Sequence, residues 1–180
     1  HIRRSFDNRE IEFVLSHAIS REKFVIAYFI GFSILATILI VPVVITLAYF
    51  FNVEFWSAYY WTISLLLELI IISTFAFLAS LILSSAVSSV LATFGFYIVS
   101  RLMGFAVAYI ILPKQIQHYD TNSFMELILK GFSIVLPRLD LFAKSKWLVY
   151  SEIDLESLQI VLLQALIYIP FLLFMTILDF

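Results

Sequence analysis

The sequence predicts an all-α, polytopic helical membrane protein with about four transmembrane helices, an amphipathic cytoplasmic helix and an outer interfacial helix. The composition is the first reason: 63% of the residues are hydrophobic and only 13% are charged, whereas soluble domains carry roughly 25% charged residues. A chain of 180 residues cannot bury so much apolar surface in a globule, so a membrane is the expected solvent. The second reason is that its uncharged runs have the length of membrane spans.

The first uncharged run, 24–51, is long enough to cross a membrane. At ~1.5 Å per residue it would form a helix of about 42 Å, against roughly 30 Å of hydrocarbon. Pro42 lies inside the run, and a membrane helix tolerates such a kink where neighbours satisfy the freed carbonyl. Trp56, Tyr59 and Trp61 follow the run, and aromatic clusters of this kind mark a membrane–water interface.

The next run, 59–112, carries only Glu68 and Arg101 as charged residues and is too long for one crossing. The small polar cluster Ser-Ser-Ala-Val-Ser-Ser at 84–89 is therefore the expected turn. This division gives two spans, 59–83 and 87–112.

The last predicted span, 157–178, contains Pro170 and is preceded by Asp154 and Ser151, either of which could cap its start. Four spans place both ends of the chain on one side of the membrane. The predicted organisation is therefore a segment 1–23 followed by a transmembrane domain 24–180 with an outer loop 113–156.

The basic residues set the predicted orientation. Segment 1–23 concentrates cations beside the first span, whereas the turn at 52–58 has none and the connection 113–156 mixes basic with acidic residues. Cytoplasmic loops carry the excess of Lys and Arg, so 1–23 is expected in the cytoplasm and 113–156 outside. The cations of the first segment are Arg3, Arg4, Arg9, Arg21 and Lys23.

Segment 8–24 is patterned as a helix, a break and a second helix. Asp7 with Glu10 three residues later is a variant of the capping box, and Ser20 can cap the helix that enters the membrane. Between them, four apolar residues form one helical stripe: Ile11, Val14, Leu15 and Ala18. Two interpretations fit this pattern: an interfacial helix lying on the bilayer, or a helix that docks on a partner.

The sequence carries no recognised catalytic motif. Lys130 precedes Gly131, so the phosphate-binding order of Gly, Lys and Ser/Thr does not occur, and HExxH and GxSxG are also missing. The three histidines His1, His17 and His118 lack metal-ligand spacing. We therefore expect no enzyme activity, metal or cofactor in this chain, and no nucleic-acid partner.

Two intramembrane charges and one outer helix are further candidate features. Glu68 and Arg101 could pair between adjacent spans or line a polar path; alternatively, Glu68 is protonated or faces another subunit while Arg101 extends to an interface. Ser123 and Glu126 form a capping box for a short amphipathic helix that ends before Pro137, which is expected to lie along the outer interface.

The segment REIEFVLSHAISREKFVIAYFIG resembles the coupling-helix region of type-2, exporter-like permeases of ATP-binding-cassette (ABC) transporters. LASLILSSAVSSVLATFGFYIV and LPRLDLFAKS resemble, more loosely, the turn between the family's fourth and fifth spans and the segment before its last span. Ala18 stands where the family usually has Pro, and Tyr28 where it often has Lys. The positions that match are Glu10, Glu12, Leu15, Ser16, Ile19, Ser20, Arg21 and Gly31.

The resemblance implies a permease subunit of a bacterial inner membrane that binds a separate ATPase subunit and a second permease copy or paralogue. The family usually has six spans, with the coupling helix between the second and third, so it also implies that the first two spans are missing from this chain. The alternatives are a secondary transporter or channel driven by an ion gradient, and a non-transporting subunit of a larger complex. The implied ATPase-docking residues are Glu10, Glu12, Leu15, Ser16, His17, Ala18, Ile19, Ser20 and Arg21.

Overall fold

The computed structural model describes residues 20–51, 53–111, 127, 131, 136–150 and 154–179. Its four long helices are long and apolar enough to cross a membrane, which confirms the predicted all-helical membrane fold. All four coincide closely with the expected spans. They are α3 (Arg21–Phe51), α4 (Phe55–Ile82), α5 (Ala86–Ile111) and α8 (Leu155–Asp179).

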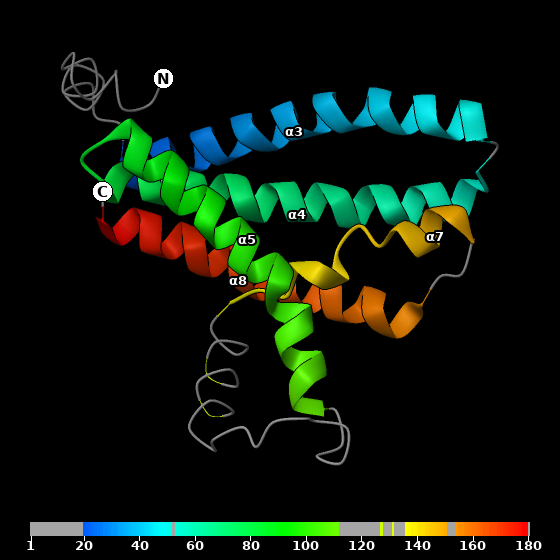
Figure 1. Cartoon of the computed structure of the whole chain (residues 1–180). Helices are drawn as coiled ribbons and strands as arrows, with labels where there is room; N and C mark the ends of the chain where they lie inside the picture. The colour runs from blue at the N-terminus through cyan, green and yellow to red at the C-terminus, as the bar shows by residue number, and fades with distance from the viewer. Residues whose placement is uncertain are drawn as a thin grey trace.

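Helix α4 is the centre of the bundle. It contacts α3, α5 and α8, and α5 crosses the other spans obliquely (Figure 1). Phe24 and Val25 at the start of α3 pack with Phe77 near the end of α4 and with Ile177 near the end of α8. The beginning of α3 and the end of α8 therefore lie at the same end of the bundle, as four crossings require.

Side-chain caps explain where two of the spans begin. The Lys23 amide donates to Ser20 Oγ at 3.4 Å, and the Ser157 amide donates to Asp154 Oδ1 at 3.3 Å. Each bond satisfies one of the amides that the first turn of a helix leaves without a partner. The predicted caps at Ser20 and Asp154 are thus confirmed, while Ser151 lies outside the described residues.

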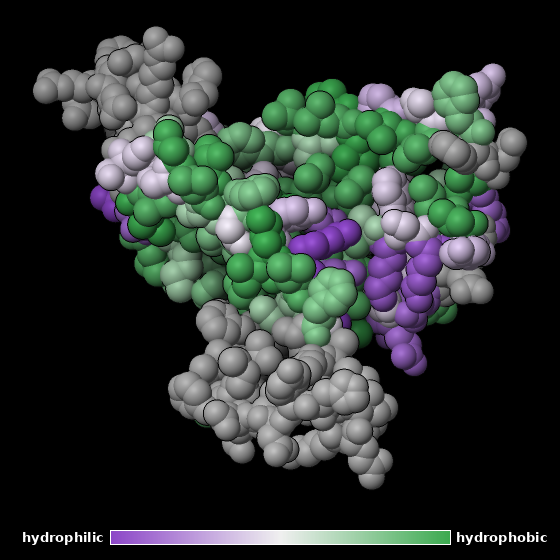
Figure 2. Space-filling model, viewed as in Figure 1, coloured by the Kyte–Doolittle hydropathy of each residue, from purple (hydrophilic) through white to green (hydrophobic). Residues whose placement is uncertain are grey.

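Helix α3 presents apolar side chains to the outside along much of its length. The hydroxyls of Ser33, Thr37 and Thr46 each donate to a carbonyl one turn earlier in α3 itself, at 2.8, 2.9 and 2.7 Å. Because these polar groups are satisfied within the helix, α3 can face hydrocarbon at little cost. Figure 2 shows apolar side chains over most of the visible face, and polar ones mainly beside α5 and near α7.

Segment 136–150 packs among the spans. It contains the 3₁₀ turn η1 (Leu139–Leu141) and the short helix α7 (Ser145–Val149), and Leu139, Phe142 and Trp147 are fully buried. Leu139 and Phe142 share one apolar core with Ile71 of α4 and with residues of α8. This packing among the spans differs from the expectation that 113–156 is an outer connection.

Candidate functional site

Glu68 and Arg101, the two charged residues of the middle spans, form an ion pair. Arg101 Nη1 of α5 lies 3.0 Å from Glu68 Oε1 of α4. Glu68 is buried, with 4% of its surface exposed. Of the alternatives that the sequence left open, the structure has the pairing between adjacent spans, because an unpaired charge at this depth is costly.

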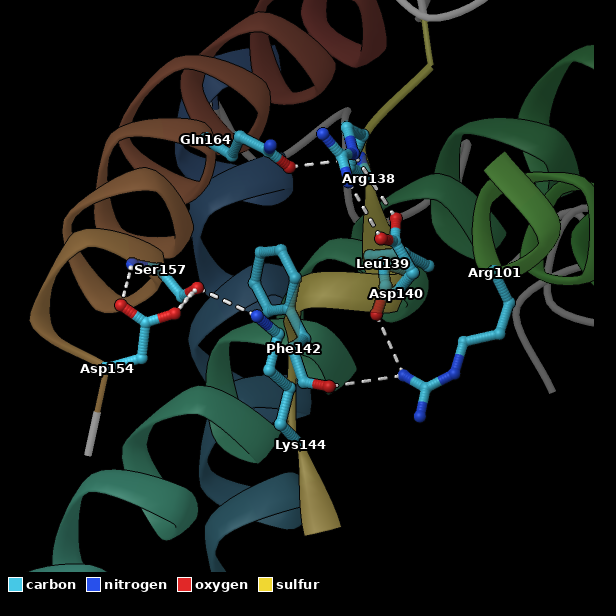
Figure 3. A network of polar contacts seen from close by, with 9 residues as sticks. All are labelled: Arg101, Arg138, Leu139, Asp140, Phe142, Lys144, Asp154, Ser157 and Gln164. Atoms are coloured by element: carbon cyan, nitrogen blue, oxygen red, sulfur yellow. Dashed lines mark hydrogen bonds and ion pairs between the residues drawn. The ribbon is translucent and has the colours of Figure 1, made fainter. Parts of the chain in front are cut away.

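The same guanidinium nitrogen also binds segment 136–150. Nη1 donates to the carbonyl oxygens of Leu139 at 2.8 Å and of Phe142 at 3.3 Å (Figure 3). Non-helical backbone inside a membrane protein is tolerated only where its polar groups find partners, and Arg101 supplies them here. We refer to Glu68, Arg101 and these two carbonyl groups as the polar junction.

Two further side chains satisfy amides of segment 136–150. The Arg138 amide donates to Gln164 Oε1 of α8 at 3.0 Å, and the Ala143 amide donates to Ser64 Oγ of α4 at 2.9 Å. Ala143 has φ 46°, a left-handed conformation that costs an L-residue roughly 1–2 kcal/mol. The bond from Ser64 helps to hold this turn in place, so three spans together fix the segment.

Helix α5 and η1 lie in close contact where the backbone of Gly104 meets the side chain of Asp140. Asp140, held by Arg138 Nη2 at 3.0 Å, lies directly over Gly104 of α5. A Cβ atom at Gly104 would lie 2.5 Å from Asp140 Oδ2 and 2.9 Å from Asp140 Cβ. Glycine is therefore required at this position, because any side chain would push η1 away from α5.

A second polar group lies where α8 begins. Lys144 Nζ donates to Ser157 Oγ at 2.7 Å, and the Ser157 hydroxyl donates in turn to Asp154 (Figure 3). Burial lowers the pKa of Lys144, and the neighbouring Lys146 adds to this effect. Hydrogen bonds from the side chain and the amide of Ser157 lower the pKa of Asp154.

An open cavity of about 810 Å³ lies between α3, α4 and α5. Its walls are mostly apolar, and Glu68 and Arg101 of the polar junction line it. The site therefore combines a charged pair with a long apolar surface. Among the described residues, no group of three or more acidic or histidine side chains is placed to hold a metal ion.

The predicted docking segment lies almost wholly outside the described residues. Of its members, only Ser20 and Arg21 are described: Ser20 caps α3, and Arg21 is exposed in its first turn. The docking interpretation stays a prediction. The outer helix predicted to begin at Ser123 and to end before Pro137 is described only at Leu127 and Gly131, which are exposed, and at Leu136, which is partly buried.

Comparison with known proteins yields no match: no family model, no curated protein and no solved structure is similar to this chain. The chemistry of the site must therefore be argued from its own residues.

Sequence reasoning missed Ser64, Gln164 and the carbonyls of segment 136–150. Ser64 and Gln164 lie within predicted spans, and a polar side chain there usually needs a partner. That signal could have identified them as candidates. The identity of the partner could not be read, because it depends on how a distant segment folds back onto the spans.

Proposed function

We propose that this chain is the membrane-spanning permease subunit of an ATP-driven transporter that exports a substrate across a bacterial inner membrane. In this proposal a separate ABC-type ATPase hydrolyses ATP and docks on residues 8–21, and a second permease copy or paralogue completes the pathway. The chain itself contributes no catalytic residue.

One observation carries the proposal. The helix α3 begins at the Ser20 cap, immediately after the segment that resembles a coupling helix, and its first turns are already packed on other spans. Tyr28 stacks on Phe77 of α4 with ring centroids 5.4 Å apart, and Val25 is fully buried. Because α3 begins at Arg21, directly after Ser20, a force applied at Ser20 would displace α3 directly against α4 and α8.

Cross-linking tests the proposed docking. The chain contains no cysteine, so His17→Cys can be placed without background and treated with a photoreactive thiol reagent in native membranes. We expect a product that contains an ABC-type ATPase, and none from the control Thr37→Cys, which lies within α3. Labelling of the His17→Cys variant only by reagents added from outside the cell, or cross-links to lipid alone, would reject the proposal.

A secondary transporter is the second candidate, and the partly buried Glu68–Arg101 pair favours it. Coupling to an ion gradient uses ionisable groups within the spans, and this pair lines a cavity. Proteoliposomes that contain the chain without any ATPase separate the two candidates. Transport that follows a proton gradient and is lost in Glu68→Gln would support the secondary transporter; transport that appears only with the ATPase and ATP would support the permease.

A further inference from the structure

The cavity between α3, α4 and α5 has the size and lining of a ligand site. Its volume of about 810 Å³ is within the range of roughly 300–1,000 Å³ that small-molecule sites occupy. Phe32 of α3, Ile72 of α4 and Phe94 of α5 are among its apolar walls. Along α5 its lining runs from Ala86 to Arg101, about 22 Å of helix. The cavity is therefore long and suited to an extended hydrocarbon chain.

The serine and threonine hydroxyl groups of the cavity wall donate their protons to carbonyl groups of the chain. Ser80 donates to the Phe77 carbonyl at 2.7 Å, Ser89 donates to the Ala79 carbonyl at 3.1 Å, and Thr93 donates to the Ser89 carbonyl at 2.8 Å. These groups leave the wall of that half of the cavity without a strong hydrogen-bond donor. A hydrocarbon chain can therefore lie against this wall without leaving a hydrogen-bond donor unsatisfied.

The other half of the cavity offers a partly exposed guanidinium group. Arg101 has five N–H donors, and its partners among the described residues are all bound by Nη1. The Nε–Nη2 edge is one of the two edges through which a guanidinium group can bind carboxylate or phosphate with two parallel bonds. The side chain of Arg101 is 39% exposed, against 5% for Glu68. A head group in the cavity would therefore meet the guanidinium group rather than the buried carboxylate.

We propose that this cavity binds a single-chain amphiphile with an anionic carboxylate or phosphate head group. The hydrocarbon chain lies against α4 and α5, and the head group binds the Nε–Nη2 edge of Arg101. This occupant matches the apolar wall and the partly exposed guanidinium group at once, whereas a plain apolar helix would leave that group facing hydrocarbon. Binding needs no ATPase, so the inference can be tested independently of the proposed function.

The test uses the whole chain in phosphatidylcholine nanodiscs with a palmitic acid that carries a photoreactive diazirine. Val90 lines the cavity and is 67% exposed, whereas its neighbour Leu91 is 64% exposed and is not part of the lining. We expect Val90→Trp to reduce labelling of α4 and α5 peptides at least tenfold by blocking the cavity. Leu91→Trp is the matched control and should label like the wild type.

The head group is tested with a trimethylammonium probe of the same chain length and with Glu68→Gln. We expect at least tenfold weaker labelling by the cationic probe, and several-fold stronger labelling by the anionic probe in Glu68→Gln, which removes a nearby negative charge. Equal labelling by both probes, or of both Trp variants, would overturn the proposal. So would a disulfide between two copies of the Val90→Cys variant with no labelling by the fatty acid, since the groove would then be a subunit contact.

Discussion

The two interfaces that α4 forms with its sequence neighbours are held by different chemistry. Its contact with α3 is apolar and aromatic, with Tyr28, Phe32 and Phe77 packed together. Its contact with α5 also has a ring stack, between Phe75 and Phe96, but adds the Glu68–Arg101 pair, whose arginine binds segment 136–150. Packing alone is geometrically permissive, whereas charge-assisted hydrogen bonds fix distance and direction.

This difference predicts that some elements of the bundle move together while another moves against them. The polar junction joins α4, α5 and segment 136–150, and Gln164 adds α8 through the Arg138 amide. These elements are expected to move as one unit. Helix α3 contacts the unit through side chains that can slide past one another, so it is the element best suited to respond to force applied at its Ser20 end.

Removing the cation of the polar junction should have the largest effect. Arg101→Leu leaves the buried Glu68 carboxylate and the Phe142 carbonyl without the guanidinium group, while the Leu139 carbonyl keeps the Phe142 amide as its donor. The loss should be about 3 kcal/mol, the low end for breaking a buried pair, because the Arg101 side chain is itself 39% exposed. Thermal unfolding in detergent, followed by size-exclusion chromatography, measures the loss. The double variant Glu68→Gln/Arg101→Leu should lose less than the sum of the single variants. Unchanged thermal stability of Arg101→Leu would show that the junction does not hold the unit together.

Adding a methyl group between η1 and α5 should have the next largest effect on stability. In Gly104→Ala the new methyl group would lie 2.5 Å from Asp140 Oδ2, and overpacking of this kind costs about 1–3 kcal/mol. Gly95→Ala is the matched control on the same helix, because in the described part of the chain nothing beyond its own helix backbone lies within 4 Å of its Cβ position. We expect Gly95→Ala to be neutral or slightly stabilising in the same unfolding assay. Equal behaviour of the two variants would contradict the described contact.

Acidification should weaken the start of α8. Folding lowers the pKa of Asp154 from its ordinary value of 3.8. The ionised Asp154 therefore stabilises the fold fully above pH 3.8, and this stabilisation is lost as the pH falls through the lower folded-state pKa. The unfolding temperature of the wild type should therefore fall more between about pH 5 and pH 3 than that of Asp154→Asn, which keeps a capping oxygen without the charge. Parallel curves would exclude a titrating cap.

The smallest expected effect is at the start of α3. The Ser20 cap bond is long, at 3.4 Å, so Ser20→Ala should cost about 0.5 kcal/mol, the low end for a helix cap. Ser20→Asp should restore the loss, because Asp is an equally good capping residue. Hydrogen exchange of the amides of the first turn measures both variants, and unaltered exchange in Ser20→Ala would show that packing of Phe24 and Val25 alone holds this end.

Much of the span architecture could be read from the sequence, because charge and hydropathy alone decide which segments enter a membrane. The caps at Ser20 and Asp154 were readable for a similar reason, since capping is a local property. For Arg101, the sequence offered Glu68 as one possible partner and did not predict the others. They depend on segment 136–150 folding back between spans, and that tertiary arrangement leaves only weak traces in the sequence, such as Ser64 and Gln164 inside predicted spans.

The most direct test of this account measures distances between spin labels in the chain assembled with the proposed ATPase. One pair, Ile38→Cys and Leu166→Cys, joins α3 to α8, and a second pair, Leu102→Cys and Leu166→Cys, joins α5 to α8. All three positions are exposed. We predict that ATP binding shifts the first distance distribution and leaves the second unchanged. A constant first distance together with a changed second one would contradict the account.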